Sequence, residues 1–103
     1  MLGLTPSDGQ LMVMLLTAGW QNSEYDQLVD TTAKNCIQAI DEAATRIGML
    51  HRYKYIGYAE AGQEVLQGYG EENLAFMKNV SKNYDPGQIF QNLVRGGFKL
   101  ADL

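Results

Sequence analysis

An uninterrupted apolar run, LMVMLL at residues 11–16, is the first pattern along the chain. Helix and strand compete for it, because Met and Leu surround a single Val13. Asp8-Gly9 precedes the run and Ala18-Gly19 follows it, which leaves a window too short for a typical helix. We therefore predict a strand. A strand that is apolar on both faces needs cover on both sides.

The clearest element is an amphipathic helix over residues 23–48. Ser23 is its predicted N-cap, and the acidic Glu24 and Asp26 suit the first turn, where the helix dipole favours negative charge. Gly48 is the predicted C′ residue. Apolar residues recur at helical spacing along one stripe, at Val29, Ala33, Cys36, Ile37, Ile40, Ala44 and Ile47.

The segment HRYKYIGYA, residues 51–59, predicts a second strand rich in tyrosine. Successive side chains of a strand point to opposite faces. One face would then carry His51, Tyr53, Tyr55 and Gly57, and the other Arg52, Lys54, Ile56 and Tyr58.

Two further helical segments are expected in the second half. Residues 71–85 place Phe76, Met77, Val80 and Tyr84 along one stripe, after a polar loop at 60–70 with room for one helical turn. The sequence DPGQ then ends this helix and opens a short one, with Asp85 as N-cap, Pro86 at N1 and Gln88 at N3. Gly96-Gly97 predicts a turn.

These elements predict an α+β fold: a single domain, residues 1–103, in the order strand, helix, strand, helix, with a sheet packed against helices. Two strands make a poor independent sheet. We therefore expect dimerisation to complete the sheet, and a homodimer as the working form.

Composition and charge exclude several classes of function. The 103 residues carry a net charge of -4, which argues against binding to nucleic acid or to an anionic membrane. The start of the chain lacks the features of a secretory signal, and no apolar stretch approaches the roughly 20 residues of a membrane span. We expect a soluble, cytoplasmic protein. One His and one Cys do not build a zinc site, so no metal is expected.

The tyrosine-rich segment is the remaining candidate for chemistry. A tyrosine works as a general acid or base when a neighbouring cation or donor lowers its pKa. Candidate catalytic residues are His51, Tyr53 and Tyr55, which share one face of the predicted strand. Candidate contacts to a small-molecule substrate are Trp20, Met12, Met14 and Tyr58. The alternative is that tyrosine is simply a good strand former.

Four short motifs, in order, resemble the C-terminal region of fungal FAD-linked oxidases of the berberine-bridge type. They are YKYIGYA at 53–59, YGEEN at 69–73, YDPGQIF at 84–90 and GGFKL at 96–100. Residues 4–20 also resemble the strand that precedes the long helix in these enzymes. The resemblance implies shared ancestry and a similar local fold. The base used by some members corresponds to Tyr53 or Tyr55.

Two departures from the family pattern bear on function. The family's FAD-binding domain, where a His and often a Cys anchor the flavin, has no counterpart in this sequence. Gly57 also stands where the family carries an Asn close to the flavin. We therefore expect a flavin-free enzyme of fungal secondary metabolism, without a cofactor, that performs cyclase, isomerase or dehydratase chemistry on a polyketide- or terpenoid-like intermediate.

Two alternatives stay open. The chain could be a fragment or subunit of an FAD-linked oxidoreductase, in which case FAD is the cofactor. It could also be a non-enzymatic dimeric module that binds an apolar ligand.

Overall fold

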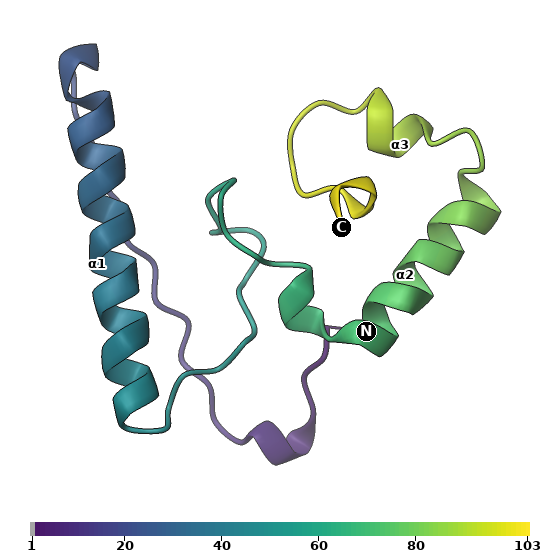
Figure 1. The fold of residues 1–103 in the computed structure, drawn as a ribbon, viewed down its shortest axis with the longest axis horizontal. Helices are drawn as coiled ribbons and strands as arrows, with labels where there is room; N and C mark the ends of the chain where they lie inside the picture. Colours follow the sequence, from purple (N-terminus) through teal and green to yellow (C-terminus); the bar gives the residue numbers. More distant parts are fainter. Residues whose placement is uncertain (1) are drawn as a thin grey trace. The chain divides into compact units, whose positions relative to one another are not determined.

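The computed structural model describes residues 2–103, and these residues form helices and loops without a β-strand. Two compact units divide them. Unit 1 comprises residues 2–13 and Arg52–Leu103, and unit 2 comprises Met14–His51. Unit 2 holds the 3-10 turn η2 (Ser23–Tyr25) and helix α1 (Asp26–Arg46). Unit 1 holds the 3-10 turns η1 (Pro6–Asp8), η3 (Gln67–Tyr69) and η4 (Leu100–Asp102), and helices α2 (Glu71–Tyr84) and α3 (Ile89–Asn92) (Figure 1).

The predicted α+β fold, with a sheet packed against helices, is therefore wrong for this chain. Residues 11–16 are neither strand nor helix. No main-chain hydrogen bond joins them to another main-chain group in the part of the chain that the structure describes. A strand exists only through such pairing, and a two-stranded sheet is at best marginal in water. Residues 11–16 have the apolar pattern of a buried strand, but no second strand pairs with them within the described residues.

The second predicted strand, residues 51–59, is wrong for a different reason. The chain turns back within it, because the amide of Tyr58 donates to the carbonyl of Tyr55 at 3.0 Å. The amide of Ala59 likewise donates to the carbonyl of Ile56 at 3.4 Å. Gly57 lies inside this turn, so the alternation of faces expected of a strand stops at Tyr55.

The long helix is confirmed as α1. Its start differs in detail from the prediction, because Asn22, not Ser23, caps the preceding turn through a bond from the amide of Glu24 at 3.1 Å. Its end follows the prediction: Gly48 has φ 69°. The amides of Gly48 and Met49 donate to the carbonyls of Thr45 and Ala44, as in a Schellman motif.

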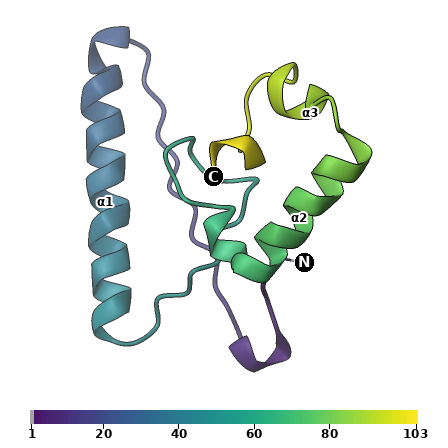
Figure 2. The ribbon, with the colours of Figure 1, turned by 45° about the vertical axis from the view of Figure 1, so that its right-hand side comes forward.

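In unit 2, no residue of helix α1 is fully buried. Residues 14–20 run back alongside the helix in both views (Figures 1 and 2). The indole N–H of Trp20 donates to Asp26 Oδ1 at 2.5 Å, which ties this segment to the start of α1. The predicted stripe is half-buried at Val29, Ala33, Ile37, Ile40 and Ala44, whereas Cys36 is exposed.

Unit 1 has a small core centred on the segment that the sequence predicted as a loop. Its buried hydrophobic residues are Val65, Leu66 and Tyr69. The chain passes close to them at Gly68, where an added Cβ would collide with the carbonyl oxygen of Arg52. The partly buried residues packed against this core are Tyr53, Ala59, Leu74, Met77, Phe98 and Leu100.

Helix α2 is confirmed, and the short helix after DPGQ is present but begins later than predicted. Gln88, not Asp85, is the residue at the N-cap of α3, and it adopts the left-handed conformation with φ 55°. Asp85 nevertheless caps the helix through its side chain. Its two carboxylate oxygens accept from the amides of Ile89 at 2.8 Å and Phe90 at 3.0 Å. Within residues 2–103, no helix has both the length and the apolarity needed to cross a bilayer.

Candidate functional site

The turn at residues 55–58 brings together two of the candidate tyrosines. The rings of Tyr55 and Tyr58 meet edge to face, with centroids 4.8 Å apart. A regular strand would have placed them on opposite faces, so the turn creates a contact that the sequence did not predict. Both rings are about half exposed, at 45% and 55%.

Tyr53 lies apart from that pair and packs into the core. Its ring stacks on the ring of Tyr69, with centroids 6.0 Å apart and an interplanar angle of 24°. Burial raises the pKa of Tyr69, and the nearby Tyr53 phenol raises the pKa further when it is charged. A tyrosine phenol, with an ordinary pKa of 10.0, is neutral at physiological pH, and the raised pKa extends the neutral range of Tyr69 to more alkaline pH. The ring of Tyr53 thus packs against the core of unit 1 by stacking on the neutral phenol ring of Tyr69.

The other candidate residues belong to different parts of the chain. His51 is the last residue of unit 2, whereas Tyr53 and Tyr55 belong to unit 1. Met12 belongs to unit 1 and is 83% exposed. Met14 and Trp20 belong to unit 2 and are also exposed. The geometry within unit 1 brings Tyr55 together with Tyr58, and Tyr53 together with Tyr69.

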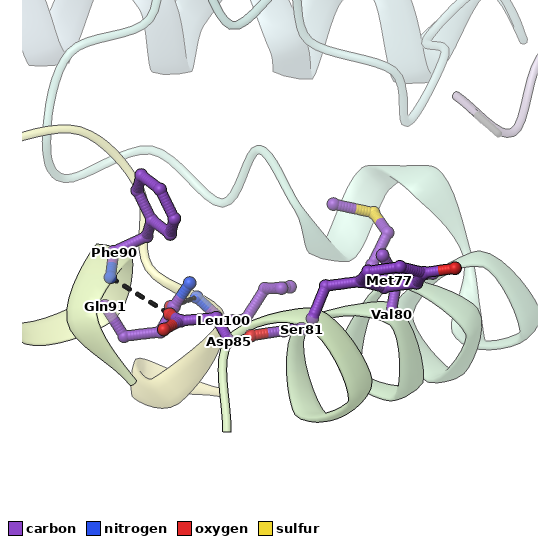
Figure 3. A pocket seen from close by; sticks show the side chains of 8 residues that line it. Met77, Val80, Ser81, Asp85, Phe90, Gln91 and Leu100 are labelled. Atoms are coloured by element: carbon purple, nitrogen blue, oxygen red, sulfur yellow. Dashed lines mark hydrogen bonds between the residues drawn. The ribbon is translucent and has the colours of Figure 1, made fainter. Parts of the chain in front are cut away.

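An open pocket lies elsewhere in unit 1, between α2, α3 and η4 (Figure 3). Its volume is about 350 Å³, at the lower end of the range of ligand pockets. The residues that line it are Met77, Val80, Ser81, Tyr84, Asp85, Phe90, Gln91 and Leu100. The helix stripe predicted from the sequence supplies three of them, Met77, Val80 and Tyr84.

Two polar side chains of this pocket, those of Asp85 and Gln91, help to hold the fold together. Asp85 caps α3, as Figure 3 shows for the bond from Phe90. Gln91 Oε1 accepts from the amides of Leu100 at 2.9 Å and Ala101 at 3.3 Å, which attaches the last residues to α3. Lys99, which does not line the pocket, donates through Nζ to the carbonyls of Phe90 at 3.2 Å and Val94 at 2.7 Å. The pocket thus presents mainly apolar side chains to a ligand.

The pocket does not fit FAD. A flavin dinucleotide carries two phosphates, which proteins bind with cationic side chains or with main-chain amides at a helix N-terminus. The lining residues include no Lys, Arg or His, and their one charged side chain is the acidic Asp85. A flavin would need to be held by residues beyond those lining this pocket.

The sequence pointed to some of these features and missed others. Asp85 was predicted as a capping residue because Asp before Pro is typical of a helix start. The core residues Val65 and Leu66 were missed, because they lie in a polar, glycine-containing segment without a helical or alternating period. Gln91 was missed because its bonds join residues nine and ten positions apart.

Comparison with known proteins finds relatives over nearly the whole chain. A protein of Emericella nidulans named FAD-dependent monooxygenase sdcF is 40% identical over 99 residues, which cover 96% of this chain and 21% of the relative. A protein of Cochliobolus heterostrophus named FAD-dependent monooxygenase tpcD is 35% identical, with coverages of 96% and 19%. A protein of Diaporthe leptostromiformis named oligopeptidase PhomG' is 35% identical, with coverages of 98% and 8%.

No family model matches the chain, and no solved structure matches it. The chain spans about a fifth of the length of the FAD-dependent relatives that it matches. The chain is thus homologous to one part of fungal proteins that are named FAD-dependent monooxygenases.

Proposed function

We propose that the chain serves fungal secondary metabolism as one segment of an FAD-dependent monooxygenase, and that it acts only when packed on a larger FAD-binding body. The body is either the remainder of a longer chain or a separate subunit. The observation that carries this proposal is the mismatch between the apolar surface of the chain and its small core, together with the greater length of its relatives.

The apolar surface of each unit supports the proposal. Unit 1 buries three hydrophobic residues, and α1 in unit 2 buries none. Scattered exposed apolar residues are normal on a monomer, but a run of adjacent ones marks an interaction surface. The longest such run is Leu11, Met12, Val13, Met14, Leu15 and Leu16, all between 43% and 83% exposed. A surface of this kind is typical of a segment taken out of a larger core.

The chemistry of the pocket also supports the proposal that the larger body, and not this chain, binds FAD. Its lining has no cation for a diphosphate, so FAD would be held by the larger body. In an enzyme of this kind the flavin supplies the redox chemistry. The residues of this chain would shape the surroundings and exclude water.

A chimera tests the proposal. The aligned segment of the Emericella nidulans relative is replaced by this chain, and the product is compared with the intact relative and with the relative lacking the segment. We expect the chimera to retain FAD at a stoichiometry close to that of the intact relative, and the deleted form to lose it. A chimera that folds but retains no more FAD than the deleted form would contradict the proposal.

A second function is favoured by one contact. A Cβ added to Gly57 would lie 2.8 Å from Cε1 of Tyr55, so the Tyr55 ring occupies space that the family's Asn would need. An Asn at residue 57 would therefore compete with the Tyr55 ring for the same space. This observation supports a flavin-free enzyme of redox-neutral cyclase, isomerase or dehydratase type, with Tyr55 as its acid or base.

The test of this second function is the comparison of Tyr55→Phe with Tyr58→Phe in assays of polyketide- and terpenoid-like intermediates without FAD. If Tyr55 is the acid or base, its loss lowers turnover by about 100-fold or more. The Tyr58 variant keeps most of the turnover, and both variants keep the melting temperature within about 3 °C. Equal activity of the two variants would eliminate Tyr55 as the catalytic group.

A further inference from the structure

We propose that the pocket between α2, α3 and η4 is a binding site for an uncharged, mainly apolar small molecule that carries a carbonyl oxygen. The carbonyl oxygen accepts a hydrogen bond from the side-chain amide of Gln91. This inference goes beyond the proposed function, because it requires neither FAD nor a larger body. All the residues that line the pocket belong to unit 1.

One wall of the pocket is a single face of α2. Its residues follow one another at spacings of three and four, which places their side chains on the same side of the helix. They are Met77, Val80, Ser81 and Tyr84. Figure 3 shows Met77 at one end of the pocket and Phe90 at the other. The ligand therefore meets a largely apolar surface along the length of the pocket.

The opposite wall is held in place by bonds within unit 1. Gln91 of α3 accepts from the amide of Leu100 at 2.9 Å, and both residues line the pocket. Lys78 Nζ donates to the carbonyl of Leu103 at 2.8 Å, which attaches the segment around η4 to α2. A site with walls that are already fixed loses less conformational entropy when a ligand binds.

The charge of the lining selects an uncharged ligand. Asp85 is the one charged residue among the lining residues, and both of its oxygens already accept from main-chain amides. An anionic ligand would give up its water beside this carboxylate, and no cationic side chain of the lining would replace that water. A neutral molecule avoids this cost.

Gln91 selects a ligand with a carbonyl oxygen. Its Oε1 accepts from two amides, those of Leu100 and Ala101. Because only the oxygen end of a side-chain amide accepts, these bonds fix its orientation and leave Nε2 as a donor. Within residues 2–103, no protein group accepts a hydrogen bond from Nε2. A purely apolar ligand would take water away from this donor, whereas a carbonyl oxygen would pair with it.

NMR titration of the full chain with three probes of similar shape tests the ligand class. The probes are 2-acetylnaphthalene, a ketone; 2-isopropenylnaphthalene, in which a methylene replaces the oxygen; and the anion 2-naphthoate. We expect the ketone to shift the amide signals of Ser81, Phe90 and Gln91. It should bind at least tenfold more tightly than the anion. A folded chain that binds no ketone, or that binds the anion as tightly, would overturn the inference.

Gln91→Glu tests the hydrogen bond to the ligand without removing the bonds that hold the wall. The variant keeps an oxygen for the amides of Leu100 and Ala101 and replaces the free donor by a second oxygen. The added charge weakens both neutral probes, so the readout is the ratio of ketone affinity to hydrocarbon affinity. This ratio should fall about tenfold from the wild type to the variant. An unchanged ratio, with amide exchange at Leu100 also unchanged, would overturn the role of Gln91.

A pair of tryptophan variants tests the place of binding. Val80→Trp fills the pocket from α2 and should weaken ketone binding at least tenfold. Leu93→Trp is the control, because Leu93 is 73% exposed and does not line the pocket. Its affinity should stay within about twofold of the wild type. Ser81→Leu, a smaller filling change on the same wall, decides the question if Val80→Trp does not fold. Folded filling variants that bind the ketone normally would contradict this location.

The alternative occupant of the pocket is the larger FAD-binding body. In the chimera described above, Val80→Trp should still weaken ketone binding at least tenfold. A folded chimera that retains FAD but lacks this binding would show that the body fills the pocket, which overturns the inference and leaves the proposed function standing. A chimera that binds the ketone in this way but retains no FAD would do the reverse.

Discussion

At the scale of single residues, Tyr69 is a titratable side chain within the small core of unit 1. It is 3% exposed and stacks on Tyr53, and its pKa is raised by burial and by that neighbour. The sequence predicted that Tyr69 packs into the core beside a helix, but not its contact with Tyr53, because that contact joins residues 16 positions apart. A contact of this kind follows from tertiary packing, which local periodicity does not encode.

The raised pKa predicts a loss of stability at alkaline pH. An unfolded Tyr69 titrates at its ordinary value of 10.0, whereas the folded phenol holds its proton to higher pH. The stabilising contribution is therefore full below that value and is lost as pH rises through the raised folded pKa. Urea unfolding of the wild type and of Tyr69→Phe, from about pH 8 to about pH 11, should show a steeper loss in the wild type. Parallel curves for the two proteins would contradict this assignment.

Gly57 controls the position of Tyr55. A side chain at residue 57 must push the Tyr55 side chain aside, because its nearest atoms, Cε1, Cζ and the phenol oxygen, lie 2.8–3.1 Å from an added Cβ. Gly57→Asn should therefore break the edge-to-face contact between Tyr55 and Tyr58 and cost about 1 kcal/mol, the range of an off-rotamer side chain. Loss of the nuclear Overhauser contacts between the two rings reports the change. Gly87→Asn, where an added Cβ meets only Ile89 at 3.7 Å, should leave them intact.

At the scale of elements, the two long helices were predicted correctly, whereas the two predicted strands are absent from the described residues. Helix α1 carries its own signals: the half-buried stripe, the acidic first turn and Gly48 at its end. Its main-chain hydrogen bonds are internal, so local sequence signals predict where it begins and ends. Residues 11–16 and 51–59 have a strand-like composition, but a strand needs a partner from elsewhere in the chain or from another protein.

Asp85 caps the start of α3. Its carboxylate accepts from two amides at the start of a four-residue helix, while the side chain is nearly buried. Asp85→Ala should lower the free energy of unfolding of unit 1 by about 1–2 kcal/mol and release α3. Asp85→Asn keeps an acceptor and should lose less. Urea denaturation and amide exchange at Ile89 and Phe90 measure both effects, and an unchanged midpoint for Asp85→Ala would show that the cap is dispensable.

At the scale of the whole molecule, the sequence indicated the need for a partner but not its kind. The apolar run and the pair of unsupported strands predicted a homodimer, and that prediction is untested. The fold adds that the core of unit 1 is three residues and that the candidate site splits between two units. The comparisons add that the chain matches one part of much longer proteins. These findings together favour a larger FAD-binding body.

Native mass spectrometry tests this central claim most directly. The chain is measured alone, with FAD, and with FAD and the Emericella nidulans relative from which the aligned segment has been deleted. The account predicts that the chain alone takes up no FAD, and that the three components form a complex with one copy each of chain, trimmed relative and FAD. A stable homodimer of the chain that ignores both the trimmed relative and FAD would contradict the account and favour a flavin-free, independent protein.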